Sequence, residues 1–186
     1  FMADITDAAQ VQGMVDGVVR QFGRLDILVL NASYRSETLF VDMTFEQWRR
    51  VMSITLDGSF HCIKASLPPL IKAGGGNIVT LGGDSALSGA VGKVNNSAAK
   101  NGLVGMTRAL AKELAQYGIR VNCVSPGVIA TVRAAYRAPR RPIEGRVPLG
   151  RGGDPNELAA TVRFLCSSGG GFITGQTIHV NGGAYM

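Results

Sequence analysis

Short apolar runs alternate with longer amphipathic segments along the whole chain, and this alternation limits the fold more than any other feature. The runs lack polar alternation, as strands do when both of their faces are buried. They are residues 26–30, 77–81, 119–125 and 176–181. The segments between them place apolar residues at helical spacing. The pattern predicts an α/β fold with a doubly wound parallel sheet of the Rossmann type, covered by helices on both faces.

Capping signals set the expected ends of several helices. Thr44 and Gln47 have the spacing of a capping box, and the helix that they open should be kinked or ended by Pro68 and Pro69. The segment 154–157, Asp-Pro-Asn-Glu, has the composition of a helix start. The chain therefore reads as one α/β unit with defined element boundaries.

Length and composition indicate one domain, residues 1–186, because 186 residues with 46% hydrophobic content can bury a sizeable core. The formal net charge is +6, and most of it lies between residues 128 and 152. That segment holds Arg133, Arg137, Arg140, Arg141, Arg146 and Arg151 against Glu144 alone. Residues 132–150 are expected to form a mobile basic lid. It is either simply solvated or recognises an anionic substrate handle such as a phosphopantetheine or a carboxylate.

Several classes of function and location fit poorly. A nucleic-acid binder is the weakest hypothesis, because only Tyr136 accompanies the arginines and no binding module is present. No apolar run is long enough to cross a bilayer, so we expect no membrane partner and a cytoplasmic location. The cysteines Cys62, Cys123 and Cys166 read as buried free thiols, and no metal site is expected. His61 and His179 are expected to have no chemical role.

Ligands of a doubly wound sheet bind at the carboxyl ends of its strands. In this sequence those ends are Asn31-Ala32-Ser33, Gly82-Gly83-Asp84, Ser125-Pro126-Gly127 and Gly182-Gly183. A lysine, Lys100, lies on the first turns of a small-residue helix expected at 97–117. We expect the site to lie at this edge of the sheet.

These pieces, in this order, resemble the short-chain dehydrogenase/reductase family. The matching parts are Asp4, GRLDILVLNA (23–32), NIVTLGG (77–83), Lys100, LAKELAQYGIRVNCVSPGVIAT (110–131), PLGRGGDPNELA (148–159) and FITGQTIHVNGG (172–183). They cover essentially the whole chain. The closest likeness is to 3-oxoacyl-carrier-protein reductases.

The resemblance implies an oxidoreductase that uses NAD or NADP and acts on a small molecule, anionic or thioester-linked. The implied cofactor-binding residues are Asp4, Asn31, Ala32, Lys100, Pro126, Gly127, Ile129 and Thr131. In the family the lysine holds the nicotinamide ribose. A partly solvated lysine is the alternative for Lys100, and a simple strand-end turn is the alternative for Asn31 and Ala32.

The sequence departs from the family in its proton chemistry. The family's tyrosine, serine and helix asparagine correspond here to Asn96, Gly83 and Thr55, so that only Lys100 remains. The resemblance implies a degraded active site in which Lys100 and Asn96 are the candidate catalytic residues. The Asn96 amide would stabilise an enolate-like oxygen during hydride transfer to a conjugated thioester. The alternative is an inactive homologue with a binding or oligomer role.

Other side chains near the strand ends are candidate replacements for the family's tyrosine and serine. They are Tyr34, Asp84, Ser85 and Asn95.

A second departure lies at the front of the chain. The family opens with a strand, a GxxxGxG turn and a helix that bind the dinucleotide pyrophosphate, and nothing here corresponds to them. The N-terminal strands of the fold are therefore expected to be missing, with NAD(P) binding by residues 1–186 weak or absent. Small residues along 97–109 suit close helix contact, and the family's habit implies a homodimer or homotetramer.

Overall fold

A parallel β-sheet forms the centre of the molecule, seen in a computed structural model that describes residues 1–131, 143 and 145–186. In the described part of the chain the strands are β1 (Ile27–Leu30), β2 (Gly76–Leu81), β3 (Ile119–Pro126) and β4 (Thr177–Val180). They lie side by side in that order, and every pair is parallel. The predicted parallel sheet is confirmed, with each strand within one or two residues of its expected bounds.

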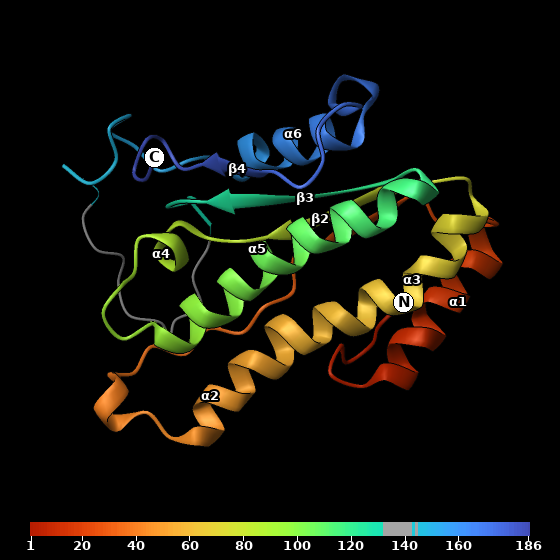
Figure 1. Cartoon of the computed structure of the whole chain (residues 1–186). Helices are drawn as coiled ribbons and strands as arrows, with labels where there is room; N and C mark the ends of the chain where they lie inside the picture. Colours follow the sequence, from red (N-terminus) through yellow and green to blue (C-terminus); the bar gives the residue numbers. More distant parts are fainter. Residues whose placement is uncertain (132–142, 144) are drawn as a thin grey trace.

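Helices cover both faces of this sheet (Figure 1). The elements are α1 (Ala8–Phe22), η1 (Phe40–Asp42), α2 (Phe45–Met52), the π-helical η2 (Ser53–Asp57), α3 (Gly58–Lys72), α4 (Asp84–Leu87), α5 (Val94–Leu114), η3 (Ala115–Tyr117), α6 (Pro155–Cys166) and η4 (Ser168–Gly170). One core cluster joins α1, α3 and α5 to the sheet, and a second lies under α6. Alternate residues of β2 show the two layers: Ile78 belongs to the first cluster and Val79 to the second.

Capping residues fix the helix ends as the sequence predicted. The Thr44 hydroxyl accepts from the Gln47 N–H at 3.2 Å, while the Gln47 side chain accepts from the Thr44 N–H at 3.0 Å. Asp154 and Glu157 form the same reciprocal pair at the start of α6. Each pair satisfies two backbone donors that a helix start leaves open.

The prolines of α3 do not end the helix, so that alternative of the two expected for them is wrong. Pro68 and Pro69 lie inside α3, which continues to Lys72. The helix is held there by its packing, since Leu70 is fully buried against the sheet. Burial of this last turn compensates for the two backbone donors that the prolines lack.

None of the helices in the described ranges is long and apolar enough to cross a bilayer.

The small residues of α5 divide between two environments. Ala99 is fully buried, and a Cβ at Gly102 would lie 3.1 Å from Leu56, so this part of the helix packs within its own chain. Gly105 and Ala109, in contrast, are exposed, and a Cβ at Gly105 would meet nothing within 4 Å. The surface left for a second copy is therefore the later half of the predicted stripe.

We expect a symmetric dimer or tetramer with the Gly105 face of α5 buried. Sedimentation at micromolar concentration should show the oligomer for the natural chain. Gly105→Lys, which places a charge in that face, should shift it towards the monomer, whereas Lys112→Ala at the far end of α5 should not. A natural chain that sediments as a monomer would remove the prediction.

Candidate active site

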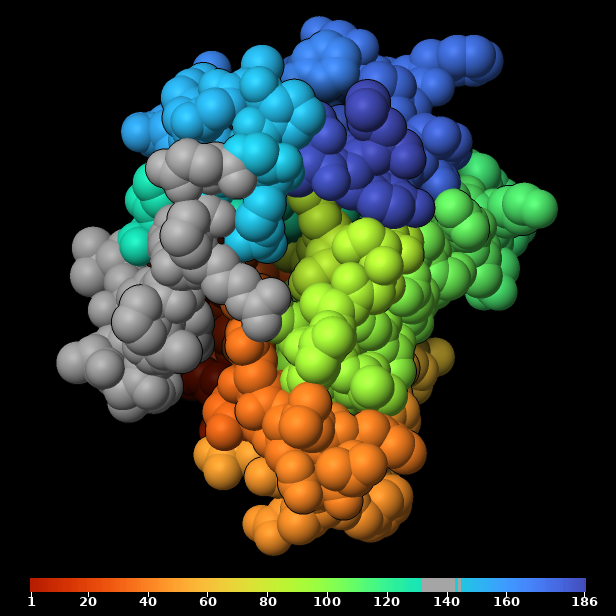
Figure 2. Space-filling model, turned by 90° about the vertical axis from the view of Figure 1, so that its left-hand side faces the viewer, coloured from red at the N-terminus to blue at the C-terminus, as the bar shows by residue number. Residues whose placement is uncertain are grey.

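The carboxyl ends of the four strands meet at one edge of the sheet. Figure 2 looks onto this edge: the segment after β1 (orange), residues 84–95 (yellow-green) and the C-terminal residues (dark blue) surround it. Because all strands are parallel, the residues that follow them converge there, as doubly wound sheets require of a ligand site. The expected location of the site is thus present in the fold.

Lys100 lies at this edge, with its amino group directed at the end of β2. Its Nζ donates to the Leu81 carbonyl oxygen at 2.5 Å. Burial lowers the pKa of Lys100 to about 8, the nearby Arg35 acts in the same direction, and Cys123 opposes the shift. Lys100 is therefore a partly buried cation whose charge is partly desolvated. The ribose-contact role and the alternative of a partly solvated lysine with a buried stem both stay predictions.

Asn96 lies one helical turn before Lys100, on the same face of α5. Its Nδ2 donates to the Ser36 carbonyl at 2.8 Å and to the Asn95 Oδ1 at 3.1 Å. These bonds tie the segment after β1 to the first turn of α5. Both amide protons of Asn96 are thus engaged within the protein, and a bound oxygen would have to compete for one of them.

Gly83 leaves a gap at the end of β2. A Cβ there would meet nothing within 4 Å, and the φ of 165° is extended backbone that any residue adopts. A side chain at this position would project into free space without backbone strain. The absence of a hydroxyl at Gly83 therefore reflects the sequence and not a steric limit.

Asp84, the next residue, is directed at β3 and β4. Its Oδ1 accepts from the Ser125 hydroxyl at 3.4 Å and lies 3.7 Å from the His179 Nδ1. Burial raises the pKa of Asp84, while Asn181, His179 and Ser125 act in the opposite direction. The sequence assigned His179 no partner, because residues 95 positions apart carry no signal of contact. Their meeting depends on the strand order.

The segment after β3 is held against two neighbouring parts of the chain. The Gly127 N–H donates to the Val180 carbonyl at 3.0 Å, and a Cβ at Gly127 would lie 2.7 Å from that of Asn181. Further along, Ile129 and Gly153 form a parallel bridge. The structure thereby brings the predicted cofactor residues 126–131 to the same edge as Lys100.

The predicted basic lid falls mainly on residues 132–142 and 144, which lie outside the described residues. Of its neighbours, Arg151 pairs with Glu157 at 2.7 Å at the start of α6. That pairing lowers the pKa of Glu157 to about 2. Arg151 thus stabilises a helix start, and the substrate-recognition reading of the basic segment stays a prediction.

The remaining predicted residues lie beside β1. Asp4 accepts from the Thr6 N–H at 2.9 Å and from its hydroxyl at 2.8 Å, which lowers the pKa of Asp4. The adjacent Ile5 lines a cavity of about 150 Å³ with Asn31 and Ala32. Asp4 therefore lies on the N-terminal segment, one residue before a wall of this cavity. The residues directly after β1 line the same cavity.

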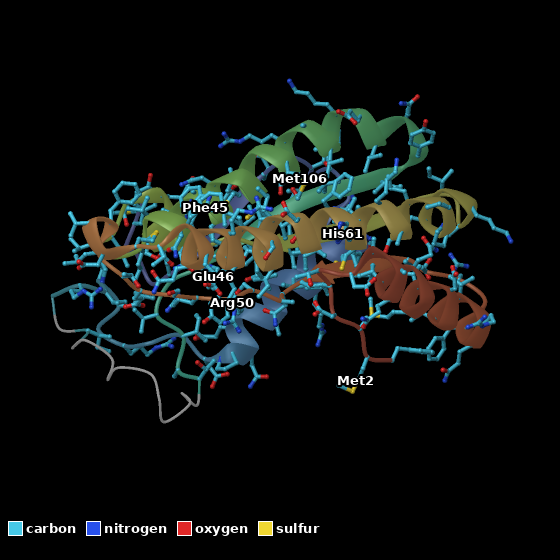
Figure 3. All side chains as sticks on the ribbon, turned by 90° about the horizontal axis from the view of Figure 1, so that it is seen from below. Met2, Phe45, Glu46, Arg50, His61 and Met106 are labelled. Carbon is cyan, nitrogen blue, oxygen red and sulfur yellow. The ribbon has the colours of Figure 1, made fainter. Side chains whose placement is uncertain are left out.

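Helix α3 fixes this segment in place. The Nδ1 atom of its His61 lies 3.0 Å from the Ile5 carbonyl oxygen. Figure 3 shows His61 on α3, with the N-terminal segment that carries Met2 below it in the view. His61 has the bracing role of a structural residue.

The sequence singled out Tyr34 and Thr55 but did not predict the surroundings that the structure gives them. The Arg50 guanidinium, which extends from α2 (Figure 3), is labelled there, and it lies 4.6 Å from the centre of the Tyr34 ring. Thr55 lies in the π-helical turn η2, fully buried, and its hydroxyl finds no hydrogen-bond partner among the described residues. Such turns and orphaned buried atoms occur often at functional sites.

Known proteins resemble this chain in sequence and fold along its whole length. A family model described as "Enoyl-(Acyl carrier protein) reductase" matches residues 1–185. The chain belongs to the short-chain dehydrogenase/reductase family. Among its relatives, the 3-oxoacyl-[acyl-carrier-protein] reductases FabG of Salmonella typhimurium and Escherichia coli K12 are 38% and 39% identical over alignments 188 residues long, which cover all of this chain and 77% of each relative. FabG of Staphylococcus aureus is 39% identical.

A solved structure shows the same fold. The short-chain dehydrogenase/reductase (glucose/ribitol dehydrogenase) of Brucella melitensis matches with a TM-score of 0.89 and 39% identity, over 100% of this chain and 75% of that one. The names of these relatives are those of reductases and dehydrogenases, so the chain belongs to a family of oxidoreductases. The predicted Rossmann-type fold is confirmed. The roles of individual site residues stay predictions.

The buried lysine should be visible in the stability of the protein. The Lys100 pKa, lowered from 10.5 to about 8, means that the folded chain releases this proton before the unfolded chain does. The cost of burying the charge is therefore fully present below about pH 8 and disappears as the pH rises through 10.5. The free energy of unfolding of Lys100→Met, relative to that of the natural chain, should therefore be highest at neutral pH and lower at pH 10.5.

Denaturant unfolding of both chains at several pH values measures this difference, with Lys112→Met on the exposed face of α5 as the control. A difference between Lys100→Met and the natural chain that stays constant with pH would show that the amino group is solvated.

Proposed function

We propose that the protein is an NAD(P)-dependent oxidoreductase with an atypical active site. It transfers hydride to or from a carbonyl/alcohol pair or a conjugated thioester. The observation that carries the proposal is Lys100, a partly buried cation held at the carboxyl edge of the sheet in a chain of this family.

The residues present fit the nicotinamide end of a dinucleotide. Open space lies in front of Gly83, two residues after Leu81, whose carbonyl accepts from Lys100. The Lys100 ammonium would supply donors for ribose hydroxyls. The other residues that would hold the cofactor are Asp4, Asn31, Ala32, Pro126, Gly127, Ile129 and Thr131. Bound there, the dinucleotide would supply or accept the hydride.

The side chains at this edge offer little help to a simple ketone. Gly83 has no hydroxyl to donate, and the amide protons of Asn96 are bonded to Ser36 and Asn95. A positioned general acid is worth roughly 10²–10⁴ in rate and an oxyanion donor about 10²–10³. We therefore expect slow reduction of simple ketones. A conjugated thioester fits the site better, because hydride transfer to it forms an enolate whose oxygen needs only a hydrogen bond for stabilisation.

The same observations favour a second candidate, an inactive homologue with a binding or oligomer role. The two differ in one measurement: the enzyme turns over a substrate with cofactor bound, and the inactive homologue binds without turnover. The curated relatives carry 3-oxoacyl-[acyl-carrier-protein] in their names, so acyl thioesters are the first compounds to assay.

Restoring two hydroxyls tests how much of the site remains. Asn96→Tyr places a phenol one helical turn from Lys100. The Lys100 ammonium favours the ionised form of that phenol. Gly83→Ser adds a donor where the structure has free space. With the cofactor shown to be bound, the double variant should reduce carbonyls faster than the natural chain by a factor on the order of 10² or more. Steady-state kinetics with NADH and NADPH measure the gain.

The matched control is Asn96→Phe with Gly83→Ala, which fills the same volume without hydroxyls and should show no gain. Brisk ketone reduction by the natural chain would show that another group already supplies the proton. No gain in the double variant, with cofactor bound by calorimetry, would favour the inactive homologue.

A further inference from the structure

The edge of the sheet carries few groups that can give up a proton. Asn96 is an amide and Gly83 has no side chain. The Oδ1 atom of Asp84 accepts from Ser125 and lies near His179 on the side of β4, while its buried Oδ2 has no hydrogen-bond partner among the described residues. Cys123 is fully buried, and burial raises the pKa of its thiol. Tyr34 lies under the Arg50 guanidinium.

Lys100 differs from these groups in position and in protonation. Its Nζ lies at the end of β2 and uses one of its three N–H groups on the Leu81 carbonyl. The open space in front of Gly83 adjoins this end of the strand. An ammonium there has two further N–H groups for an oxygen placed at the edge.

We propose that Lys100 is itself the proton donor of the reaction, giving a proton from Nζ directly to the substrate oxygen. This inference rests on the proposed function. Hydride from NADH or NADPH forms the new C–H bond, and the C=O π pair moves to oxygen. The developing alkoxide takes a proton from Nζ, which leaves a neutral amine and an alcohol. Water then returns a proton to the amine.

The surroundings of Lys100 suit this role. Burial, with Arg35 acting in the same direction and Cys123 against it, sets the pKa of Lys100 to about 8. Such a group is protonated at neutral pH and still gives up its proton readily, which is the condition for an efficient general acid. The neutral amine keeps N–H groups for Leu81, so the side chain need not move between steps.

The role also agrees with a slow reaction on simple ketones. One ammonium replaces the acid, but no second donor stabilises the alkoxide, because Gly83 carries no side chain. The gain expected from the double variant then comes mainly from the second donor, which is worth about 10²–10³.

The first test measures protonation without turnover. Competitive acylation at a series of pH values, read by mass spectrometry of the peptides, gives the pKa of each lysine in the folded natural chain. We expect Lys100 to titrate near 8, with the acylation of the other lysines recorded in the same samples as an internal reference. A Lys100 that titrates at its ordinary value of 10.5 would overturn the proposal even if the protein proves to be a reductase.

The second test separates proton transfer from cofactor binding. Lys100→Arg keeps a cation for the ribose but is always protonated, so NADPH affinity should change little while the rate of reduction falls on the order of 10²-fold. The natural chain should lose rate about tenfold per pH unit above pH 8. Lys100→Ala should regain rate with added ethylammonium, and Lys112→Ala should match the natural chain.

The outcomes distinguish a failure of the proton-donor role of Lys100 from a failure of the proposed oxidoreductase function. If the natural chain reduces a carbonyl but Lys100→Arg keeps its rate, or the rate does not fall above pH 8, only the proton-donor role is wrong. Loss of rate in Asp84→Asn with an unaffected Lys100→Arg would give the role to Asp84. A natural chain that binds cofactor and reduces nothing would overturn the proposed function and the donor role together.

Discussion

The parallel hydrogen bonding of β2 to β3 is the interaction on which the other features depend. Six residue pairs join the two strands, from Gly76 with Ile119 to Leu81 with Val124, and the inner residues are fully buried. Because both strands run the same way, their carboxyl ends arrive together. The pairing of β1 and β4 on either side extends the same edge. Every side chain of the candidate site takes its position from this register.

The site holds one ammonium group, that of Lys100, and few other side chains that could donate a proton or a hydrogen bond to a substrate. Burial lowers the pKa of Lys100, and among the described residues its ammonium donates to a backbone carbonyl and forms no ion pair with a carboxylate. A buried ammonium of this kind costs free energy, and such groups are often retained for function. Around it, Asn96 serves as a structural tie, and Gly83 leaves space that a ligand or a side chain can occupy.

Asp84 and His179 show how the same edge holds a second polar group. Their meeting couples the start of α4 to β4 across the end of β3, where Ser125 lies between them. The close approach of Gly127 to Asn181 keeps that region tight, since a Cβ at Gly127 has no room. The carboxyl is thereby turned towards the C-terminal side of the site, and Lys100 is left to face the open end of β2.

The sequence by itself determined the class of fold, the strand and helix order, and the helix starts at Thr44 and Asp154. These follow from local patterns: apolar runs, helical periodicity and capping residues interact over a few positions. The sequence also placed Lys100 and Asn96 one turn apart on a helix. Their partners, the carbonyls of Leu81 and Ser36, were decided by the tertiary structure. So were the lowered pKa of Lys100, the π-helical turn at Thr55, the continuation of α3 past its prolines, and the pairing of Asp84 with His179. The physical reason is the same in each case. These properties depend on desolvation and on contacts between segments far apart in the chain, which exist only after the sheet has brought the strand ends together.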